Sequence, residues 1–278
     1  MKTKHFFVKI ILFLIAVLFT MSCNKYEGKK LRIFAGTASM PATDEIVKLF
    51  KEATGADVEV IYGSSGEILN QMQLGKTGDI FFPGSSDYME KAKELDFIFP
   101  ETEKIVCYLV PAINVQKGNP KFIKSLKDLL EPGLKIAIAN PESVCVGAYA
   151  QELINANFTR EEQKLFEANL INYTGSCEKT ATAVSMKTVD AVIGWSVFEY
   201  WDSNNIETVK LPASEIVRVG YIPVAITKFC KNRELAQEFI NYIYSEFGRQ
   251  VFGKHHYITK EEEVFEYVGE KKPVGNRK

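Results

Sequence analysis

A strand that runs into small or hydroxylated residues and then into a helix occurs four times in this chain. No other feature constrains the fold as strongly. The four junctions lie at Thr37–Ser39, Ser64–Ser65, Ser143–Gly147 and Ser176–Cys177. Strands and helices that alternate in this way predict an α/β fold with a largely parallel sheet. Ligands bind beyond the carboxyl ends of the strands in such sheets, so the four junctions are candidate binding loops.

The second junction illustrates the chemistry. It follows a predicted strand at 57–62 and opens a predicted helix at 67–74. Its glycines let a ligand approach the backbone, and Ser64 and Ser65 add hydroxyl donors. The first N–H groups of a helix lack intrahelical acceptors and lie at the positive end of the helix dipole, which suits an anion. The alternative is that these serines only cap the helix.

Two extended segments connect the halves of the chain. Residues 104–114 and 216–226 read as long strands, each with an internal proline. Because two junctions fall on either side of these segments, we predict two doubly wound α/β lobes with mixed, mainly parallel sheets. They would be joined by a two-strand hinge with a ligand cleft between them. The first lobe comprises residues 31–108 and 221–268, the second residues 109–220, and residues 269–278 form a flexible tail.

The N-terminus has the pattern of an export signal. Lysines precede an apolar run at residues 10–19, which is too short to span a bilayer. Phe19–Cys23 resembles a bacterial lipobox, with Ser22 before the cysteine. We therefore predict a signal peptide at residues 1–22, lipidation at Cys23 and a polar tether at 23–30. The mature protein would be an extracytoplasmic lipoprotein, in the periplasm or on the cell surface. The alternative is a plain cleaved signal peptide.

Composition excludes several classes of function. The net charge is −1, which gives no basic field for nucleic acid. The chain has only three histidines and no C-x-x-C or G-x-S-x-G motif, so neither a metal cluster nor an enzyme of those types is predicted. We expect no enzymatic activity and no cofactor. Beyond Cys23, the cysteines are Cys107, Cys145, Cys177 and Cys230, an even number that permits disulfides in an exported protein.

Several motifs spread over residues 31–258 resemble those of a known family. The chain is similar to the substrate-binding components of molybdate ABC importers, within the type II periplasmic binding proteins. The similarity rests on Ile-Phe-Ala-Gly at 33–36, Gly-Ser-Ser-Gly at 63–66, Gly-Lys-Thr-Gly-Asp-Ile-Phe-Phe at 75–82, Asn-Pro-Glu-Ser-Val at 140–144, Val-Asp-Ala-Val-Ile-Gly-Trp at 189–195 and Tyr-Ile-Pro-Val-Ala-Ile at 221–226.

The resemblance implies a set of oxyanion-binding residues. The family's second-loop serine falls on Ser65, beside Ser64. Its first-loop serine falls on Ala38, so that Thr37 or Ser39 must supply that hydroxyl. Two backbone donors fall on Val146 and Cys177, and the family's ligand tyrosine falls on Trp195. The same alignment brings Cys145 close to Cys177 and makes their pairing a hypothesis.

The implied ligand is molybdate or tungstate, held through its oxygens and delivered to an ABC permease by a monomeric protein. Charge-assisted hydrogen bonds contribute roughly 1.5–3 kcal/mol each, so six or seven would give about micromolar to nanomolar affinity. Other hypotheses stay open: phosphate or sulfate as the ligand, or a ligand-sensing module. Glu67, Glu142 and Glu178 lie in first turns. They either complement helix dipoles or supply the acceptor that a protonated oxyanion needs. Thr37 and Ser39 could also be caps, and Trp195 hinge packing.

Overall fold

The computed structural model describes residues 25–276 and contains two five-stranded sheets. The first sheet has the order β2-β1-β3-β10-β4. In it β1 is parallel to β2 and β3, while β10 is antiparallel to β3 and β4. The strands of this sheet are β1 (Lys30–Gly36), β2 (Asp57–Gly63), β3 (Ile80–Phe82), β4 (Lys104–Leu109) and β10 (Gly220–Ile226).

The second sheet has the order β7-β6-β8-β5-β9. Here β6 is parallel to β7 and β8, while β5 is antiparallel to β8 and β9. The strands are β5 (Pro111–Gln116), β6 (Ile136–Ala139), β7 (Leu170–Thr174), β8 (Ala191–Trp195) and β9 (Ile206–Val209). Each sheet is thus mixed, with three parallel strands on one side and antiparallel pairings on the other, and the predicted two-lobed α/β fold is confirmed.

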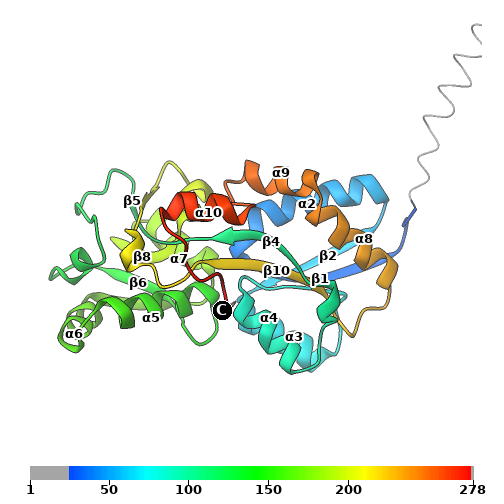
Figure 1. Cartoon of the computed structure of the whole chain (residues 1–278), viewed down its shortest axis with the longest axis horizontal. Coiled ribbons are helices and arrows are strands. Elements are labelled where there is room, and N and C mark those ends of the chain that lie inside the picture. Colours follow the sequence, from blue (N-terminus) through cyan, green and yellow to red (C-terminus); the bar gives the residue numbers. More distant parts are fainter. Residues whose placement is uncertain (1–24, 277–278) are drawn as a thin grey trace, which may run out of the picture.

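Helices cover both sheets and bury apolar stripes against them (Figure 1). In α2, for example, Ile46 and Phe50 are fully buried at helical spacing, and Phe50 packs edge-on against Phe239 of α8. The first lobe carries α2 (Met40–Thr54), α3 (Ser65–Gly75), α4 (Ser86–Glu94), α8 (Arg233–Tyr244) and α9 (Glu246–Lys254). The second carries α5 (Cys145–Asn157), α6 (Arg160–Asn169) and α7 (Cys177–Ser185). Short 3-10 turns are η1 (Thr37–Ser39), η2 (Pro100–Thr102), η3 (Lys127–Leu130), η4 (Ser196–Trp201) and η5 (Ala213–Glu215).

The chain passes between the lobes where the sequence analysis expects a hinge. Strand β4 ends at Leu109 in the first sheet, and β5 begins at Pro111 in the second, so Val110 alone separates them. The return connection enters the first sheet at β10, and β4 and β10 run side by side through the middle of the molecule (Figure 1). Pro223 lies at a register shift between β10 and β4, as expected of a residue with no N–H to donate to the ladder.

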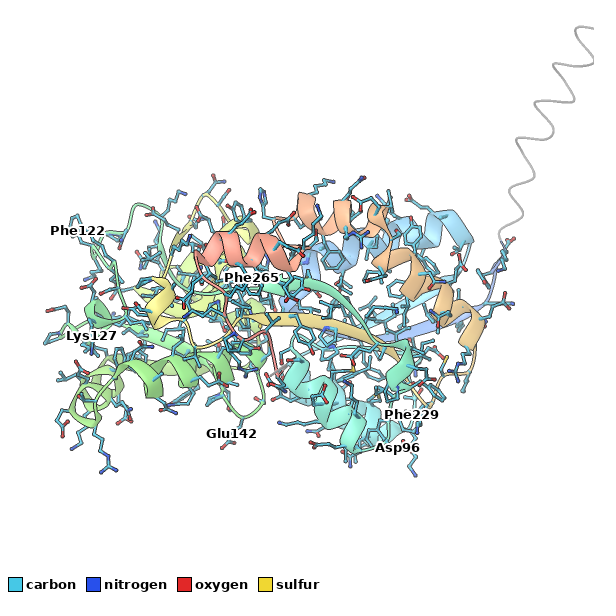
Figure 2. The ribbon with its side chains drawn as sticks, viewed as in Figure 1. Asp96, Phe122, Lys127, Glu142, Phe229 and Phe265 are labelled. Atoms are coloured by element: carbon cyan, nitrogen blue, oxygen red, sulfur yellow. The ribbon has the colours of Figure 1, made fainter. Side chains whose placement is uncertain are left out.

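The C-terminal segment differs from the expectation in two respects. The sequence predicts that helix α10 (Glu261–Val268) belongs to the first lobe, but Val264 and Val268 are buried in a hydrophobic cluster formed mainly by residues of the second. Residues 273–276 are also not a flexible tail. The Pro273 carbonyl accepts the Val219 N–H at 3.0 Å, and the Gly275 N–H bonds to the Val219 carbonyl at 2.8 Å. Figure 2 shows Phe265 of α10 above the middle of the molecule. Residues 273–276 are therefore bonded to Val219, directly before the hinge strand β10.

The predicted signal peptide and Cys23 lie outside the described residues. Within residues 25–276, no helix combines the length and the apolar character needed to cross a membrane.

Candidate functional site between the lobes

Loops from both lobes meet at Gly84, in the turn between β3 and α4. A Cβ atom on Gly84 would lie 2.8 Å from the Cys145 sulfur, 3.0 Å from the Ala38 Cβ and 3.3 Å from the Ser65 hydroxyl oxygen. Ala38 belongs to η1, Ser65 begins α3, and Cys145 begins α5 in the other lobe. The lack of a side chain at Gly84 is thus what lets these starts of helices approach one point.

Ser65 is held in place by a contact between two of these loops. Its hydroxyl oxygen accepts the Gly84 N–H at 2.9 Å, and the residue is 2% exposed. With the oxygen used as acceptor, the hydroxyl proton remains to be donated to a ligand. Ser64 has a different role. Its hydroxyl oxygen accepts the Glu67 N–H and its own N–H donates to the Glu67 carboxylate, which together form a capping box for α3.

The first loop carries two candidate hydroxyl donors, Thr37 and Ser39, which differ in their surroundings. The Ser39 hydroxyl shares a hydrogen bond of 3.0 Å with the Thr43 hydroxyl one turn further along, and its side chain makes no cap bond to α2. Thr37 is 6% exposed and precedes the point where Ala38 meets Gly84. Either hydroxyl can be the donor in the Ser39–Thr43 bond, so Ser39 and Thr37 both remain candidates for the first-loop hydroxyl donor.

The second lobe contributes the starts of α5 and α7. Val146 lies in the first turn of α5, where main-chain N–H groups have no intrahelical acceptor. Cys177 occupies the first position of α7, whose cap is the Ser176 hydroxyl, bonded to the Lys179 N–H at 3.1 Å. The two helix starts are adjacent, since the sulfur atoms of Cys145 and Cys177 are 3.5 Å apart. Both sulfurs are free thiols.

Trp195 ends β8 beside the hinge and is fully buried. Its ring packs edge-on against the Tyr149 ring, with 4.9 Å between centroids. The indole N–H finds no hydrogen-bond acceptor among the described residues. Packing against Tyr149 therefore accounts for the position of the Trp195 ring, but it leaves the indole N–H without a hydrogen-bond acceptor in the described part of the chain. A buried donor without a partner is costly and uncommon in proteins, so a ligand is a natural acceptor for it.

Ser85 and Ser86 are functional candidates that the sequence analysis did not select. Both are fully buried at the start of α4, directly after Gly84, and neither hydroxyl has a partner among the described residues. Ser85 is the N-cap residue, yet its side chain makes no cap bond. The signal was present in the sequence, because Gly84-Ser85-Ser86 is a fifth strand–small loop–helix junction.

The three candidate carboxylates are exposed to solvent, in contrast to the buried hydroxyls near Gly84. Glu67 caps α3, and the side chains of Glu67, Glu142 and Glu178 are all exposed. Figure 2 shows the Glu142 side chain directed outward at the edge of the second lobe. Glu67 and Glu178 lie in the first turns of α3 and α7, where a carboxylate complements the helix dipole. The first-turn position predicted for Glu142 is wrong, because α5 begins only at Cys145. Within residues 25–276, no group of three or more His, Cys, Asp or Glu side chains could hold a metal ion directly.

The lobes touch across the predicted cleft. The Gly66 N–H donates to the Ser143 carbonyl at 3.0 Å, and the Tyr88 hydroxyl donates to the Glu142 carbonyl at 2.9 Å. Arg218 adds an ionic clamp. Its guanidinium lies 3.0 Å from Asp87 of α4 and 2.7 Å from Glu152 of α5, so one side chain joins a carboxylate of each lobe. The conformation is therefore closed, with the two lobes in direct contact.

Two α/β lobes on a two-strand hinge, with helix starts converging between them, form the fold of the two-lobed periplasmic binding proteins. The chain belongs to the bacterial extracellular solute-binding protein family, whose family model matches residues 31–258. The resemblance noted from the motifs is thereby confirmed at the level of the family. Proteins of this family bind solutes.

Individual relatives are distant. A putative ABC transporter substrate-binding lipoprotein of Bacillus subtilis is 25% identical over 86% of this chain and 90% of its own length. A putative binding protein of Haemophilus influenzae is 29% identical over 46% of this chain, and the match spans only 51% of that relative.

Solved structures agree on the fold. The molybdate-binding protein of Azotobacter vinelandii superimposes with a TM-score of 0.72 and 17% identity, covering 83% of this chain and 100% of that chain. The sulfate-binding protein of Mycobacterium tuberculosis gives 0.74 and 15% identity, covering 88% of this chain and 93% of that one. At these identities, the match concerns the fold alone.

Proposed function

We propose that the protein captures a tetrahedral oxyanion, molybdate or tungstate, between its lobes and delivers it to an ABC permease. The convergence of Ala38, Ser65 and Cys145 on Gly84 carries the proposal, because it brings helix starts from both lobes to one point. A helix start offers unpaired N–H groups and the positive end of a dipole, the combination that binds oxyanions.

The donors are neutral and come from both lobes. The Ser65 hydroxyl, the first-loop hydroxyl and the starts of η1 and α4 belong to the first lobe, while the N–H groups of Val146 and Cys177 belong to the second. The Trp195 N–H and the Ser85 and Ser86 hydroxyls are further candidates, since all three are buried without a partner. An ion bound to both sets holds the lobes together, and closure excludes water that would weaken each bond.

The surroundings favour an ion without a proton. A hydrogen phosphate ion needs an acceptor for its own proton, and a buried carboxylate is the usual choice. No such buried acceptor is supplied by Glu67, Glu142 or Glu178, because their side chains are exposed. The Asp87 carboxylate oxygens already accept from Arg218. Molybdate, tungstate and sulfate carry no proton at neutral pH and match a cage built only of donors.

Sulfate is the second candidate, because a sulfate-binding protein shares this fold with a TM-score of 0.74. Molybdate and tungstate are preferred because the motifs at residues 63–66, 75–82 and 189–195 resemble those of molybdate importers. A larger ion also places its oxygens further from its centre, so donor spacing discriminates sulfate from the two heavier ions.

The delivery role agrees with the match to a lipoprotein of an ABC transporter. We propose that Cys23 carries the lipid anchor and that residues 23–30 act as the tether. A metabolic labelling experiment with a radioactive fatty acid tests the anchor. Incorporation that is lost in Cys23→Ala supports it, and labelling that persists in this variant contradicts it.

A thermal-shift screen tests the choice of ion. The purified protein is melted with molybdate, tungstate, sulfate, phosphate and chloride at matched ionic strength. A ligand that binds only the folded state stabilises it by RT ln(1 + [L]/Kd), or about 2.7 kcal/mol at a hundred times Kd. We expect clear shifts with molybdate and tungstate and a smaller one or none with phosphate. A shift with sulfate alone would select the second candidate.

A further inference from the structure

The two cysteines at the starts of α5 and α7 are a pair of thiols within the proposed binding site. Their sulfurs are 3.5 Å apart and both residues are 2% exposed. The Cys145 sulfur also faces the first lobe, since it lies 2.8 Å from the position that a Cβ on Gly84 would take. The pair therefore sits where the lobes meet, next to Ser65 and Ala38.

The other two cysteines of the described chain do not share this setting. Cys107 is fully buried in β4, and Cys230 is partly exposed in the turn after β10. Both belong to the first lobe, whereas Cys145 and Cys177 begin helices of the second. Only Cys145 and Cys177, among residues 25–276, have a second cysteine sulfur as a hydrogen-bond partner.

We propose that Cys145 and Cys177 form a reversible disulfide in the open, ion-free protein and stay reduced while a bound oxyanion keeps the lobes closed. The protection rests on the proposed function, because it needs an ion that closes the lobes. The pairing does not, because it needs only the adjacency of the thiols. The sequence predicts export, and exported proteins meet oxidising conditions in which disulfides persist.

The distance of 3.5 Å between the Cys145 and Cys177 sulfurs allows a disulfide to form after a small movement. A disulfide requires sulfurs about 2.05 Å apart, so the two thiols need to approach by only about 1.5 Å. Each cysteine is the first residue of its helix, where the helix joins a loop. A thiol at a helix start also gains from the positive end of the dipole once it ionises.

The reaction is an exchange with a small disulfide such as glutathione disulfide. The thiolate of one cysteine attacks that disulfide, forms a mixed disulfide and releases one glutathione thiol. The second cysteine then attacks the protein-bound sulfur and releases the other glutathione. One sulfur–sulfur bond breaks and one forms, while two electrons and the two thiol hydrogens pass from the protein to glutathione.

The closed conformation opposes the first step. The bond to Cys177 and the burial together hold the pKa of Cys145 well above its usual range, so the thiolate is scarce. The first lobe also covers the sulfur at Gly84, which keeps an oxidant of the size of glutathione out. When the lobes open, Cys145 and Cys177 are exposed to water and to the oxidant. The rate of disulfide formation is therefore proportional to the fraction of protein molecules in the open form.

The test measures disulfide formation in the full-length protein, reduced first and then exposed to glutathione disulfide. Samples with and without saturating molybdate are quenched with acid at intervals, alkylated, digested and analysed by mass spectrometry. We expect a linked Cys145–Cys177 peptide lighter by two hydrogens than the reduced pair. Molybdate should slow its appearance by about tenfold or more, in proportion to the loss of the open form. Cys230, outside the cleft, serves as the internal control and should react equally in both samples.

Single variants complete the design. Cys145→Ser and Cys177→Ser should each yield a glutathione adduct on the remaining cysteine and no linked peptide. The proposal is overturned if the unliganded wild type forms no linked peptide, or if molybdate binds by calorimetry yet leaves the rate unchanged. If none of the oxyanions binds, the proposed function fails, whereas a linked peptide in the unliganded sample still supports the disulfide.

Discussion

The hydroxyl oxygen of Ser65 accepts the main-chain N–H of Gly84 at 2.9 Å, which ties the start of α3 to the loop before α4. This bond fixes the side chain and leaves its proton directed elsewhere. It also sets Ser65 beside the point on which the Ala38 and Cys145 side chains converge.

Replacing Ser65 should weaken oxyanion binding and leave the fold intact. In Ser65→Ala the ion loses one hydroxyl donor, and the binding free energy should weaken by about 1.5–3 kcal/mol, the range for hydrogen bonds to charged groups. Titration calorimetry measures the loss. The matched control is Ser245→Ala, which removes a helix cap in the same lobe, where the Ser245 hydroxyl accepts the Gly248 N–H.

The control should lose about 1 kcal/mol of folding stability and no affinity, because Ser245 caps α9 away from Gly84. An unchanged affinity in Ser65→Ala would remove this residue from the site.

Replacing Ser85 or Ser86 with alanine should keep or raise the stability of the ion-free protein and weaken oxyanion binding. Their hydroxyls are buried without a partner in the described structure, which costs about 1–3 kcal/mol for an unsatisfied group. Ser85→Ala and Ser86→Ala should therefore melt at the same temperature as wild type or higher when no ion is present. Each should bind the oxyanion more weakly if its hydroxyl donates to the ion. Thermal melts with and without ligand measure both quantities, and equal binding by all three proteins would contradict a role for α4.

Trp195 should report binding by fluorescence. The chain contains two tryptophans, so Trp201→Phe leaves Trp195 as the single indole. The unpaired, buried Trp195 N–H gains an acceptor when the ion enters, and the emission should change in a saturable way. The reciprocal variant, Trp195→Phe, keeps Trp201, which packs on Phe198 in η4, and should respond little. A response confined to the second variant would assign Trp195 to hinge packing alone.

Arg218 should control how long the ion stays bound. Its guanidinium donates to Asp87 in the first lobe and to Glu152 in the second, and its side chain is only 12% exposed. Arg218→Met leaves two carboxylates facing each other across the cleft, which favours the open form. Ligand dissociation should be about tenfold faster, equivalent to about 1.4 kcal/mol.

Stopped-flow fluorescence measures this rate. The control is Arg233→Met, which removes an exposed ion pair with Glu101 inside the first lobe and should leave dissociation unchanged. Equal dissociation rates in the two variants would show that the Arg218 pairs do not hold the lobes closed.

Much of the fold follows from local patterns. The junctions at Thr37–Ser39 and Ser64–Ser65 are visible because long strands, β1 and β2, precede them. The fifth junction, at Ser85, follows the short strand β3 and has the same small-residue pattern, but the pattern alone does not show that this loop lies at the site. Its position beside Ser65 depends on the parallel pairing of β1 with β3, which is a tertiary contact.

The roles of individual hydroxyls could not be predicted from sequence. Ser64 and Ser65 are neighbours of the same type, and only the geometry shows that Ser64 caps α3 while Ser65 meets Gly84. The ordered contacts of the C-terminal residues could not be predicted for a related reason. Their polar, lysine-containing sequence is typical of a mobile tail, yet Val274 is buried and Gly275 pairs with Val219. Neither contact leaves a periodic pattern in the sequence.

The central claim is that neutral donors of both lobes enclose one tetrahedral, fully ionised oxyanion. Titration calorimetry of the ion-free protein with molybdate, tungstate, sulfate and phosphate tests it most directly. The account predicts one site per chain, with a Kd in about the micromolar to nanomolar range for molybdate or tungstate and much weaker binding of phosphate. The absence of saturable heat with every one of these ions, from a protein shown to be folded, would contradict it.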